Sequence, residues 1–263
     1  MSGLVMSIIT NLGDFTHIID PRHEDYMVSS PYFFWGFILT YIYSIKVLGP
    51  KLMQHRQPYN IKNIVIGYNI IQILVNLYIF FGAIYVYFSS SNWLCIDTTE
   101  KNFLANLRKY YYYLKMSDCL ETVFFILRKK YQQASFLHIY HHSAIILGSF
   151  VGFRYYYGDN VTIVGGLNSI VHTFMYIYYL LTAIDSKWRN YMAIKRGLTL
   201  IQIVQLTMMW SWMAITKVIP GCKTFPPFAL LIWITNNIFM ISLFIRFYYK
   251  TYKDNQNTVT KND

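Results

Sequence analysis

Seven long apolar stretches constrain the fold of this chain more than any other feature of its sequence. Of its 263 residues, 55% are hydrophobic and only 13% are charged, whereas a soluble domain carries about 25% charged residues. A helix needs roughly 20 apolar residues to cross the hydrocarbon core of a bilayer. The stretches cover residues 32–48, 64–88, 110–127, 135–153, 161–184, 197–215 and 228–249. The sequence therefore predicts an all-α polytopic membrane protein with seven transmembrane helices.

The basic residues predict how these helices are oriented. Most of the 23 Lys and Arg residues follow the first, third, fifth and seventh stretches, and short cytoplasmic loops hold such an excess. We therefore expect a lumenal N-terminal segment at 1–30, a single seven-helix transmembrane domain at 31–249 and a cytoplasmic polar tail at 250–263. This distribution also explains the net charge of +11 without nucleic acid, while basic loops at one mouth would attract a polyanionic coenzyme A thioester.

Two of the three cysteines fall in loops that this topology places in the lumen. They are Cys95 and Cys222, whereas the third cysteine lies inside the third stretch. Disulfides form in oxidising compartments. We therefore predict a Cys95–Cys222 disulfide.

Polar residues inside the apolar stretches are the strongest functional signal, because such residues are costly in lipid and are by default functional. The fourth stretch begins with His138, His141 and His142, which we call the histidine box, and the fifth carries His172. Within the box, spacings of three and four residues place the imidazoles on one side of a helix. The other candidates are Lys115, Asp118, Glu121, Asn168, Tyr176, Gln202 and Gln205.

Two chemistries suit the histidines. The pattern His-x-x-His-His also occurs in membrane di-iron oxygenases, and imidazole is a common iron ligand. Such centres use about eight histidines, whereas this chain has seven, three of them outside the apolar stretches. The alternative is acyl transfer, in which a neutral imidazole attacks a thioester or removes a proton. A seven-helix transporter or receptor is the third class, but three histidines at one helix end are unusual there.

Four segments resemble the very long chain fatty acid elongase family, the membrane 3-ketoacyl-CoA synthases. Residues 137–142 read LHIYHH, residues 168–179 read NSIVHTFMYIYY like the family's NxxxHxxMYxYY, and residues 199–205 match TxxQxxQ. Residues 49–69 resemble GPxxMxxRxP…YN. The matches occur in order and cover most of the chain from 49 to 227.

One segment departs from the family pattern. The family usually has KxxExxDT, whereas residues 115–122 read KMSDCLET, so the two acids Asp118 and Glu121 are exchanged. Each carboxylate moves by about one methylene relative to the helix axis. Two interpretations stay open: the acids orient catalytic histidines, or they and Lys115 only neutralise one another in lipid.

The resemblance implies a fold and a reaction. The fold would be a closed barrel of spans two to seven, built as two inverted three-helix units around an acyl tunnel, with span one outside. The reaction would condense a long-chain acyl-CoA with malonyl-CoA to 3-ketoacyl-CoA, carbon dioxide and CoA, with no cofactor and no metal. It implies residence in the endoplasmic reticulum membrane and cooperation with a ketoacyl reductase, a dehydratase and an enoyl reductase. A homodimer is compatible with the sequence, which does not define the oligomeric state.

The resemblance also implies roles for individual residues. His141 would take the acyl group, His172 would assist it, and His138 and His142 would orient it or shuttle protons. The side chains expected to stabilise the enolate are Asn168, Tyr176, Gln202 and Gln205. The side chains expected to bind CoA phosphates are Arg56, Lys130, Lys187 and Arg189. Gln133 completes a QxxxLHxxHH pattern similar to that of polyunsaturated-chain elongases, which predicts a preference for polyunsaturated acyl chains.

Overall fold

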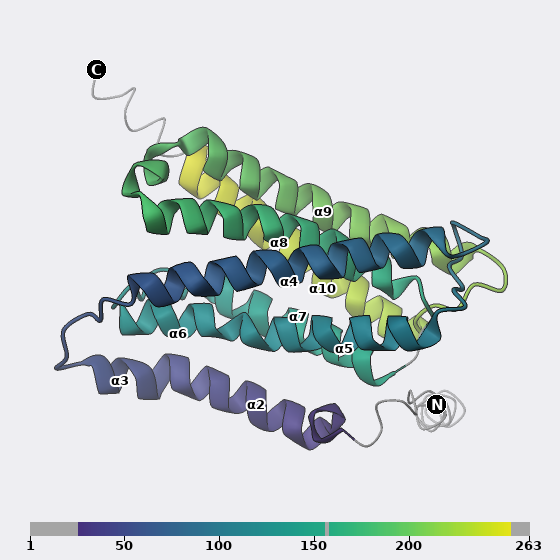
Figure 1. Ribbon diagram of the computed structural model, residues 1–263, viewed down its shortest axis with the longest axis horizontal. Coiled ribbons are helices and arrows are strands. Elements are labelled where there is room, and N and C mark those ends of the chain that lie inside the picture. Colours follow the sequence, from purple (N-terminus) through teal and green to yellow (C-terminus); the bar gives the residue numbers. More distant parts are fainter. Residues whose placement is uncertain (1–25, 156–157, 254–263) are drawn as a thin grey trace, which may run out of the picture.

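A computed structural model describes residues 26–155 and 158–253, and its regular elements in these ranges are helices without any strand. The long helices lie side by side along the long axis of the molecule (Figure 1). Their bounds are α2 (Pro31–Tyr43), α4 (Lys62–Phe88), α5 (Lys101–Ser117), α6 (Cys119–Leu127), α7 (Phe136–Arg154), α8 (Val161–Ile184), α9 (Met192–Val218) and α10 (Pro227–Tyr248). Short helical segments join or extend them: η2 (Met27–Ser29), η3 (Ser44–Leu48), α3 (Gly49–Met53), η4 (Ser186–Asn190) and η5 (Tyr249–Lys253).

Six helical segments of the described part are long and apolar enough to cross a membrane, which agrees with the predicted all-helical, multi-pass membrane protein. They are Pro31–Met53, Lys62–Phe88, Phe136–Arg154, Val161–Ile184, Met192–Val218 and Ala229–Tyr252. The predicted tail at 250–263 begins inside the last of them, and its residues 254–263 lie outside the described part. Residues 1–25 of the predicted N-terminal segment also lie outside the described part.

The third predicted span differs most from its expected form. Instead of one helix over 110–127, the structure has two collinear helices, α5 and α6, that meet at Asp118. Its first half, α5, also carries Lys101, Arg108 and Lys109, so the pair is less apolar than the six segments above. The pair runs beside α4 and α7 (Figure 1). The count of seven spans and the closed barrel stay predictions.

Two glycines allow α4 to approach its neighbours closely. A Cβ atom on Gly166 of α8 would lie 2.6 Å from Cβ of Ala83 on α4, and one on Gly82 of α4 would lie 2.6 Å from Cδ1 of Leu107 on α5. Small residues at helix contacts are typical of membrane proteins, because packing rather than the hydrophobic effect holds their helices together. These contacts fix α4 between α5 and α8.

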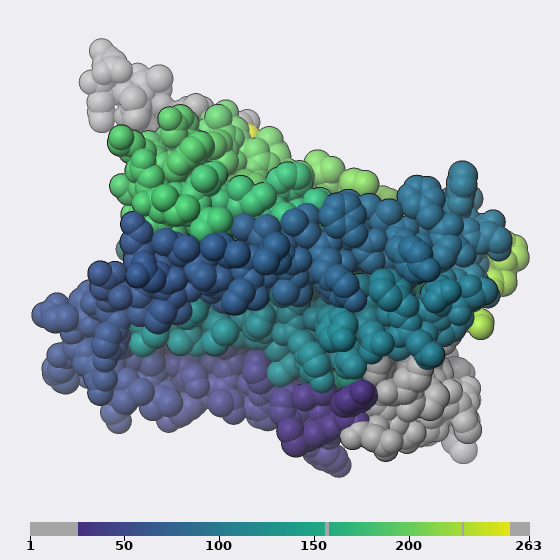
Figure 2. Space-filling view, in the orientation of Figure 1, coloured from purple at the N-terminus to yellow at the C-terminus, as the bar shows by residue number. Residues whose placement is uncertain are grey.

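The outer side of α4 is apolar. In the space-filling view its side chains form a continuous band between α5 below and α8 above (Figure 2). Large apolar residues of this helix are exposed, among them Ile71, Leu74 and Phe81. In a membrane protein such a face contacts lipid, so the polar residues of α4 are left to face inward.

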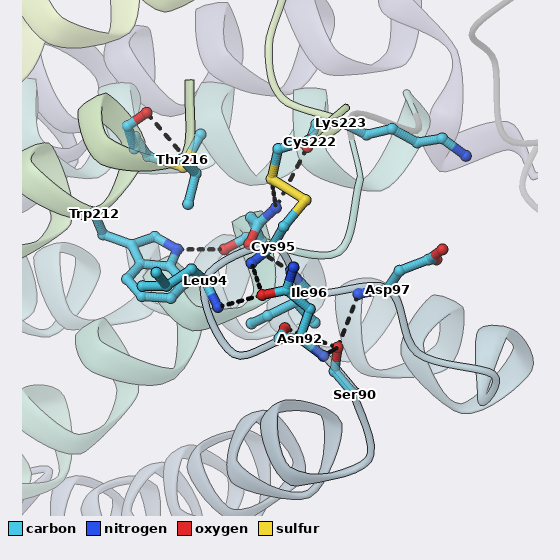
Figure 3. Close-up of a disulfide and its surroundings, with 12 residues drawn as sticks. Ser90, Asn92, Leu94, Cys95, Ile96, Asp97, Trp212, Thr216, Cys222 and Lys223 are labelled. Carbon is cyan, nitrogen blue, oxygen red and sulfur yellow. Dashed lines mark hydrogen bonds between the residues drawn. A yellow bond between two sulfur atoms is a disulfide. The ribbon is translucent and has the colours of Figure 1, made fainter. Parts of the chain in front are cut away.

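At one end of the bundle, a disulfide and a set of hydrogen bonds join three loops. We call this the disulfide end, and the opposite end, where α7 begins, the box end. Cys95 follows α4 and Cys222 follows α9, and the structure joins them in a disulfide with Cα atoms 5.4 Å apart (Figure 3). The fully buried Asn160, between α7 and α8, accepts a hydrogen bond from the backbone N–H of Ile96 at 3.1 Å and from Trp212 Nε1 at 3.2 Å.

Candidate active site

The break between α5 and α6 forms the centre of the candidate site. Helix α5 ends at Ser117 and α6 begins at Cys119, so Asp118 lies at the junction. The Tyr68 hydroxyl donates to the backbone oxygen of Ser117 at 3.3 Å. Broken helices are tolerated in membranes where other groups satisfy the freed backbone atoms. Tyr68 does this here and stabilises the break.

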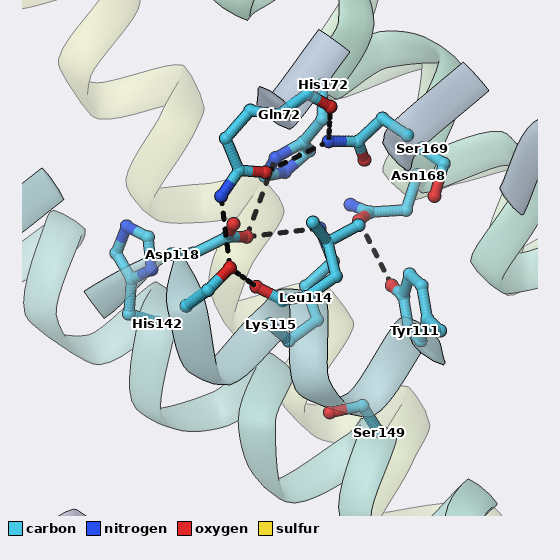
Figure 4. A network of polar contacts seen from close by, with 12 residues as sticks. Gln72, Tyr111, Leu114, Lys115, Asp118, His142, Ser149, Asn168, Ser169 and His172 are labelled. Atoms are coloured by element: carbon cyan, nitrogen blue, oxygen red, sulfur yellow. Dashed lines mark hydrogen bonds and ion pairs between the residues drawn. The ribbon is translucent and has the colours of Figure 1, made fainter. Parts of the chain in front are cut away.

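A buried ion pair occupies the break. Lys115 Nζ lies 3.2 Å from Asp118 Oδ2, and both side chains are fully buried. The other carboxylate oxygen accepts a hydrogen bond from the Tyr176 hydroxyl at 3.3 Å. His172 Nδ1 lies 3.9 Å from Asp118 Oδ2. Asp118 therefore links α5, α6 and α8, and Figure 4 shows His172 facing it from α8.

The histidine box lies in the first two turns of α7. This helix begins after Ser135, and the Ser135 hydroxyl accepts a hydrogen bond from the backbone N–H of His138. Ring centroids of His138 and His142 are 4.2 Å apart, and those of His141 and His142 are 5.7 Å apart. The His141 ring stacks on that of His172 with centroids 6.2 Å apart. The structure thus brings together all four histidines that the sequence singled out.

Three of the four imidazoles contact a side chain of α6 or of the junction between α5 and α6. His138 Nε2 is 2.9 Å from the Thr122 hydroxyl, and His142 Nε2 is 3.9 Å from Glu121 Oε2. His172 has the Asp118 contact given above. His141 is the exception: among the described residues it has neither a hydrogen bond nor a carboxylate contact, and it is only half-buried. His141 is therefore the imidazole whose nitrogens remain available.

The exchanged acids now have separate partners. Asp118 faces Lys115 and His172, whereas Glu121, one helical turn further, faces His142. Each carboxylate can hold the ring of its own histidine in one orientation. The interpretation that the acids only neutralise Lys115 accounts for Asp118 but leaves the position of Glu121 unexplained.

A polar stripe on α4 was missed in the sequence. Gln72 Nε2 donates to the Tyr68 hydroxyl at 2.9 Å and to Ser117 Oγ at 3.1 Å, and Asn76 Nδ2 donates to the backbone oxygen of Gln72 at 2.8 Å. Both side chains are buried. Their spacing of four residues inside the second apolar stretch was the available signal, because such residues belong on one inward face.

The amides proposed as enolate donors have different surroundings. Asn168 Oδ1 accepts from the Tyr111 hydroxyl at 3.0 Å, beside Lys115 in Figure 4. Gln202 and Gln205 instead donate to the thioethers of Met175 and Met209. In the described ranges neither glutamine bonds to a histidine, so their role as donors stays a prediction.

Basic side chains gather at the box end. Lys130 follows α6, and Arg189 lies in η4. Partial burial, together with the positive charges of Arg128 and Arg189, lowers the pKa of the Lys130 ammonium below its usual value. Arg128 was not among the predicted phosphate ligands, although it stands only two residues before Lys130 in the sequence. Of the other predicted ligands, Lys187 is exposed on η4, and Arg56 is exposed and donates to the Tyr59 hydroxyl at 2.9 Å.

A cavity of about 80 Å³ lies between the histidines and the disulfide end. We call it the far cavity. Its lining includes Ile145, Gly148 and Gly152 of α7, which follow His141 at intervals of three and four residues. Residues at these intervals share one helix face, so the face that carries His141 leads into the far cavity. At 1.5 Å per residue, the eleven residues from His141 to Gly152 span about 16 Å.

The site also contains a group able to hold a metal ion. Ligand atoms of Glu121, His138 and His142 all lie within 4.8 Å of one another. This is one carboxylate and two imidazoles, far fewer ligands than a pair of octahedral irons requires. The predicted absence of a catalytic metal stays an expectation.

The fold and the site define a helical, multi-pass membrane protein with a buried centre of histidines and carboxylates. A family model described as ELO, the GNS1/SUR4 family, matches residues 26–260. The chain therefore belongs to the ELO family, and the relatives below confirm the resemblance to very long chain fatty acid elongases.

Three similar proteins are described as very long chain fatty acid elongases. A very long chain fatty acid elongase of Aedes aegypti is 33% identical over 248 residues, which are 89% of this chain and 67% of that protein. Very long chain fatty acid elongase 7 of Drosophila melanogaster is 35% identical over 196 residues, 72% of this chain but only 60% of the relative. Very long chain fatty acid elongase 1 of Mus musculus is 32% identical over 241 residues, 89% of this chain and 86% of the relative.

Proposed function

We propose that this protein is a fatty acid elongase, a very-long-chain 3-oxoacyl-CoA synthase, which condenses an acyl-CoA with malonyl-CoA. The observation that carries the proposal is the arrangement of the four histidines. Three contact a hydroxyl or a carboxylate, while His141 keeps its nitrogens available at the end of a helix face that leads into an apolar cavity. A nucleophile beside an acyl pocket suits acyl transfer.

In the first step, a nitrogen of His141 attacks the thioester carbon of the acyl-CoA. The carbon–sulfur bond breaks, and the acyl group becomes an acyl-imidazole while the CoA thiolate leaves. The leaving thiolate takes the proton that the imidazole loses. His142, whose ring centroid is 5.7 Å from that of His141, is placed to move this proton, and Glu121 keeps its ring in position.

In the second step, malonyl-CoA loses carbon dioxide, and the resulting enolate attacks the acyl-imidazole. The carbon–nitrogen bond breaks, 3-ketoacyl-CoA forms, and the departing imidazolate takes up a proton from solvent, which regenerates neutral His141. We take the buried Tyr176 and Asn168 as the donors to the developing oxyanion, an interaction that typically contributes several kcal/mol. His172, stacked on His141 and facing Asp118, positions the nucleophile. No redox cofactor and no metal take part in these steps.

The ends of the bundle suit the two ends of the substrate. The acyl chain would extend from His141 into the far cavity, while the CoA phosphates would bind Arg128, Lys130 and Arg189 at the box end. Because short cytoplasmic loops hold the excess of basic residues, we propose that the box end faces the cytoplasm and the disulfide end faces the lumen of the endoplasmic reticulum. The product then passes to the ketoacyl reductase, dehydratase and enoyl reductase of the elongation cycle.

The decisive experiment gives microsomes with the recombinant protein labelled malonyl-CoA and a panel of saturated and polyunsaturated acyl-CoAs. We expect labelled 3-ketoacyl products two carbons longer, with a preference for polyunsaturated chains as Gln133 predicts. His141→Ala should abolish the products, and the exposed His55→Ala should not. Retention of wild-type elongation by His141→Ala would contradict the proposal.

A further inference from the structure

His138 and His142 are spaced like the metal ligands of zinc enzymes. They are four residues apart on α7, and their ring centroids are 4.2 Å apart. Two histidines at this spacing on one helix bind zinc in the His-Glu-x-x-His proteases. In such sites a glutamate from elsewhere supplies the third ligand, and the fourth position stays open to water.

Glu121 occupies the place of that third ligand. It belongs to α6, which packs near the start of α7, and its Oε2 atom is 3.9 Å from His142 Nε2. One ligand atom from each of the three residues falls within 4.8 Å of the others. Ligands of one zinc ion at bond lengths of about 2.0–2.2 Å lie roughly 3.5 Å apart. Side-chain shifts of about 1 Å would therefore complete the site.

We propose that Glu121, His138 and His142 form a reversible site for Zn²⁺, and that the bound ion switches off the condensation reaction. Within the part of the chain that the structure describes, the buried Nδ1 atom of His142 has no hydrogen-bond partner. Tightly held metals usually have ligating histidines whose second nitrogen donates to a carboxylate or carbonyl group. His142 lacks this support, and Nε2 of His138 already contacts the Thr122 hydroxyl at 2.9 Å, a contact that must break if this nitrogen is to bind the ion. Both features indicate a reversible inhibitor site rather than that of a resident cofactor.

Zinc would inhibit the reaction because it would make two imidazoles of the histidine box unavailable. Zinc would occupy nitrogens of His138 and His142, the groups that orient the nucleophile or move its proton. It would also place a dication beside His141. Zinc binding itself stands on the geometry alone, whereas the inhibition rests on the proposed function.

The exchanged acids make this site a property of the present chain. The family pattern has an aspartate where Glu121 stands, and its carboxylate would be one methylene shorter. Glu121→Asp restores that pattern and should withdraw the ligand from both histidines. We therefore expect it to weaken zinc binding at least tenfold.

The test uses the purified full-length protein in detergent, stripped with EDTA and titrated with ZnCl₂. Bound zinc is measured by mass spectrometry of the metal, and Co²⁺ is added separately to record the visible absorption of a site with nitrogen and oxygen ligands. The wild type should bind one zinc ion more per chain than Glu121→Gln or His142→Ala. Of these three proteins only the wild type should show the Co²⁺ band, and size-exclusion chromatography checks that each variant is folded.

Two further variants separate this inference from the proposed function. His141→Ala should bind zinc like the wild type although it is inactive, and His55→Ala should match the wild type in both respects. Equal zinc and Co²⁺ binding by wild type, Glu121→Gln and His142→Ala would overturn the site. Stoichiometric zinc with unchanged elongation would overturn the inhibition. Elongation by His141→Ala would overturn the proposed function and leave the zinc site standing.

Discussion

Replacing Lys115 by methionine removes the positive half of the buried ion pair and leaves the Asp118 carboxylate inside the bundle. Both side chains are fully buried, and the two charged atoms are 3.2 Å apart. Methionine fills a similar volume, so the lost charge dominates the effect. Breaking a buried pair in this way costs about 3–5 kcal/mol. At roughly 2–4 °C per kcal/mol for a chain of this size, we expect the unfolding temperature to fall by roughly 6–20 °C.

The assay is thermal unfolding of the purified protein in detergent, followed by tryptophan fluorescence. Lys187→Met is the matched control, because this lysine is exposed on η4, and exposed substitutions change stability by about 0.5 kcal/mol or less. The double variant Lys115→Met, Asp118→Asn has no uncompensated charge. It should recover most of the lost stability.

Either of two results would refute this reasoning. Lys115→Met could unfold at the same temperature as Lys187→Met, or the double variant could be as unstable as Lys115→Met alone. Elongation by the double variant decides between the two interpretations of the acids. Restored stability without activity means that Asp118 positions His172, whereas restored activity means that Asp118 only neutralises Lys115.

Three other perturbations test separate parts of the molecule. Gly148→Leu should shorten the longest acyl chain that is elongated, because Gly148 lines the far cavity and a Cβ there meets no atom within 4 Å. Product chain lengths measured by mass spectrometry should stay unchanged for Gly36→Leu on the exposed side of α2. Cys95→Ser should lower the free energy of unfolding by about 4–5 kcal/mol. This value is near the upper end of the range for disulfides, because the Cys95–Cys222 bond joins residues 127 positions apart in the sequence. Reduction of the wild type should reproduce the shift in a thermal unfolding experiment, and an unchanged midpoint would count against it. Arg189→Ala should raise KM for acyl-CoA several-fold with little change in kcat, since it removes a phosphate contact outside the reacting groups; a fall in kcat alone would contradict this role.

The helices and the histidines were predictable because lipid imposes a strong pattern on sequence. Apolar runs of about 20 residues mark spans, and the run at 161–184 coincides with α8. His138, His141 and His142 are close in sequence, so their shared face needed only helical periodicity. His172 joined them as the remaining histidine inside a span.

The contacts between helices were not predictable, because periodicity does not define which inward faces meet. The break at Asp118 depends on Tyr68 and Gln72, 46 or more residues earlier in the chain. Gln202 and Gln205 have the spacing of an inward stripe, yet their amides meet methionine sulfurs. Polar residues identify an interior, but only packing assigns their partners.

The fastening of the disulfide end has a mechanical consequence for the opposite end. A rod fixed at one base deflects most at its far tip, and α4, with 27 residues, is a lever about 40 Å long. Its far tip is held by an exposed hydrogen bond from Lys62 Nζ to the backbone oxygen of Ile184. A displacement too small to disturb the far cavity is therefore magnified where the histidines lie. If the protein has the proposed function, the helices can move apart at the box end to admit a bulky CoA group. The contacts of the far cavity with the methyl end of the acyl chain then stay unchanged.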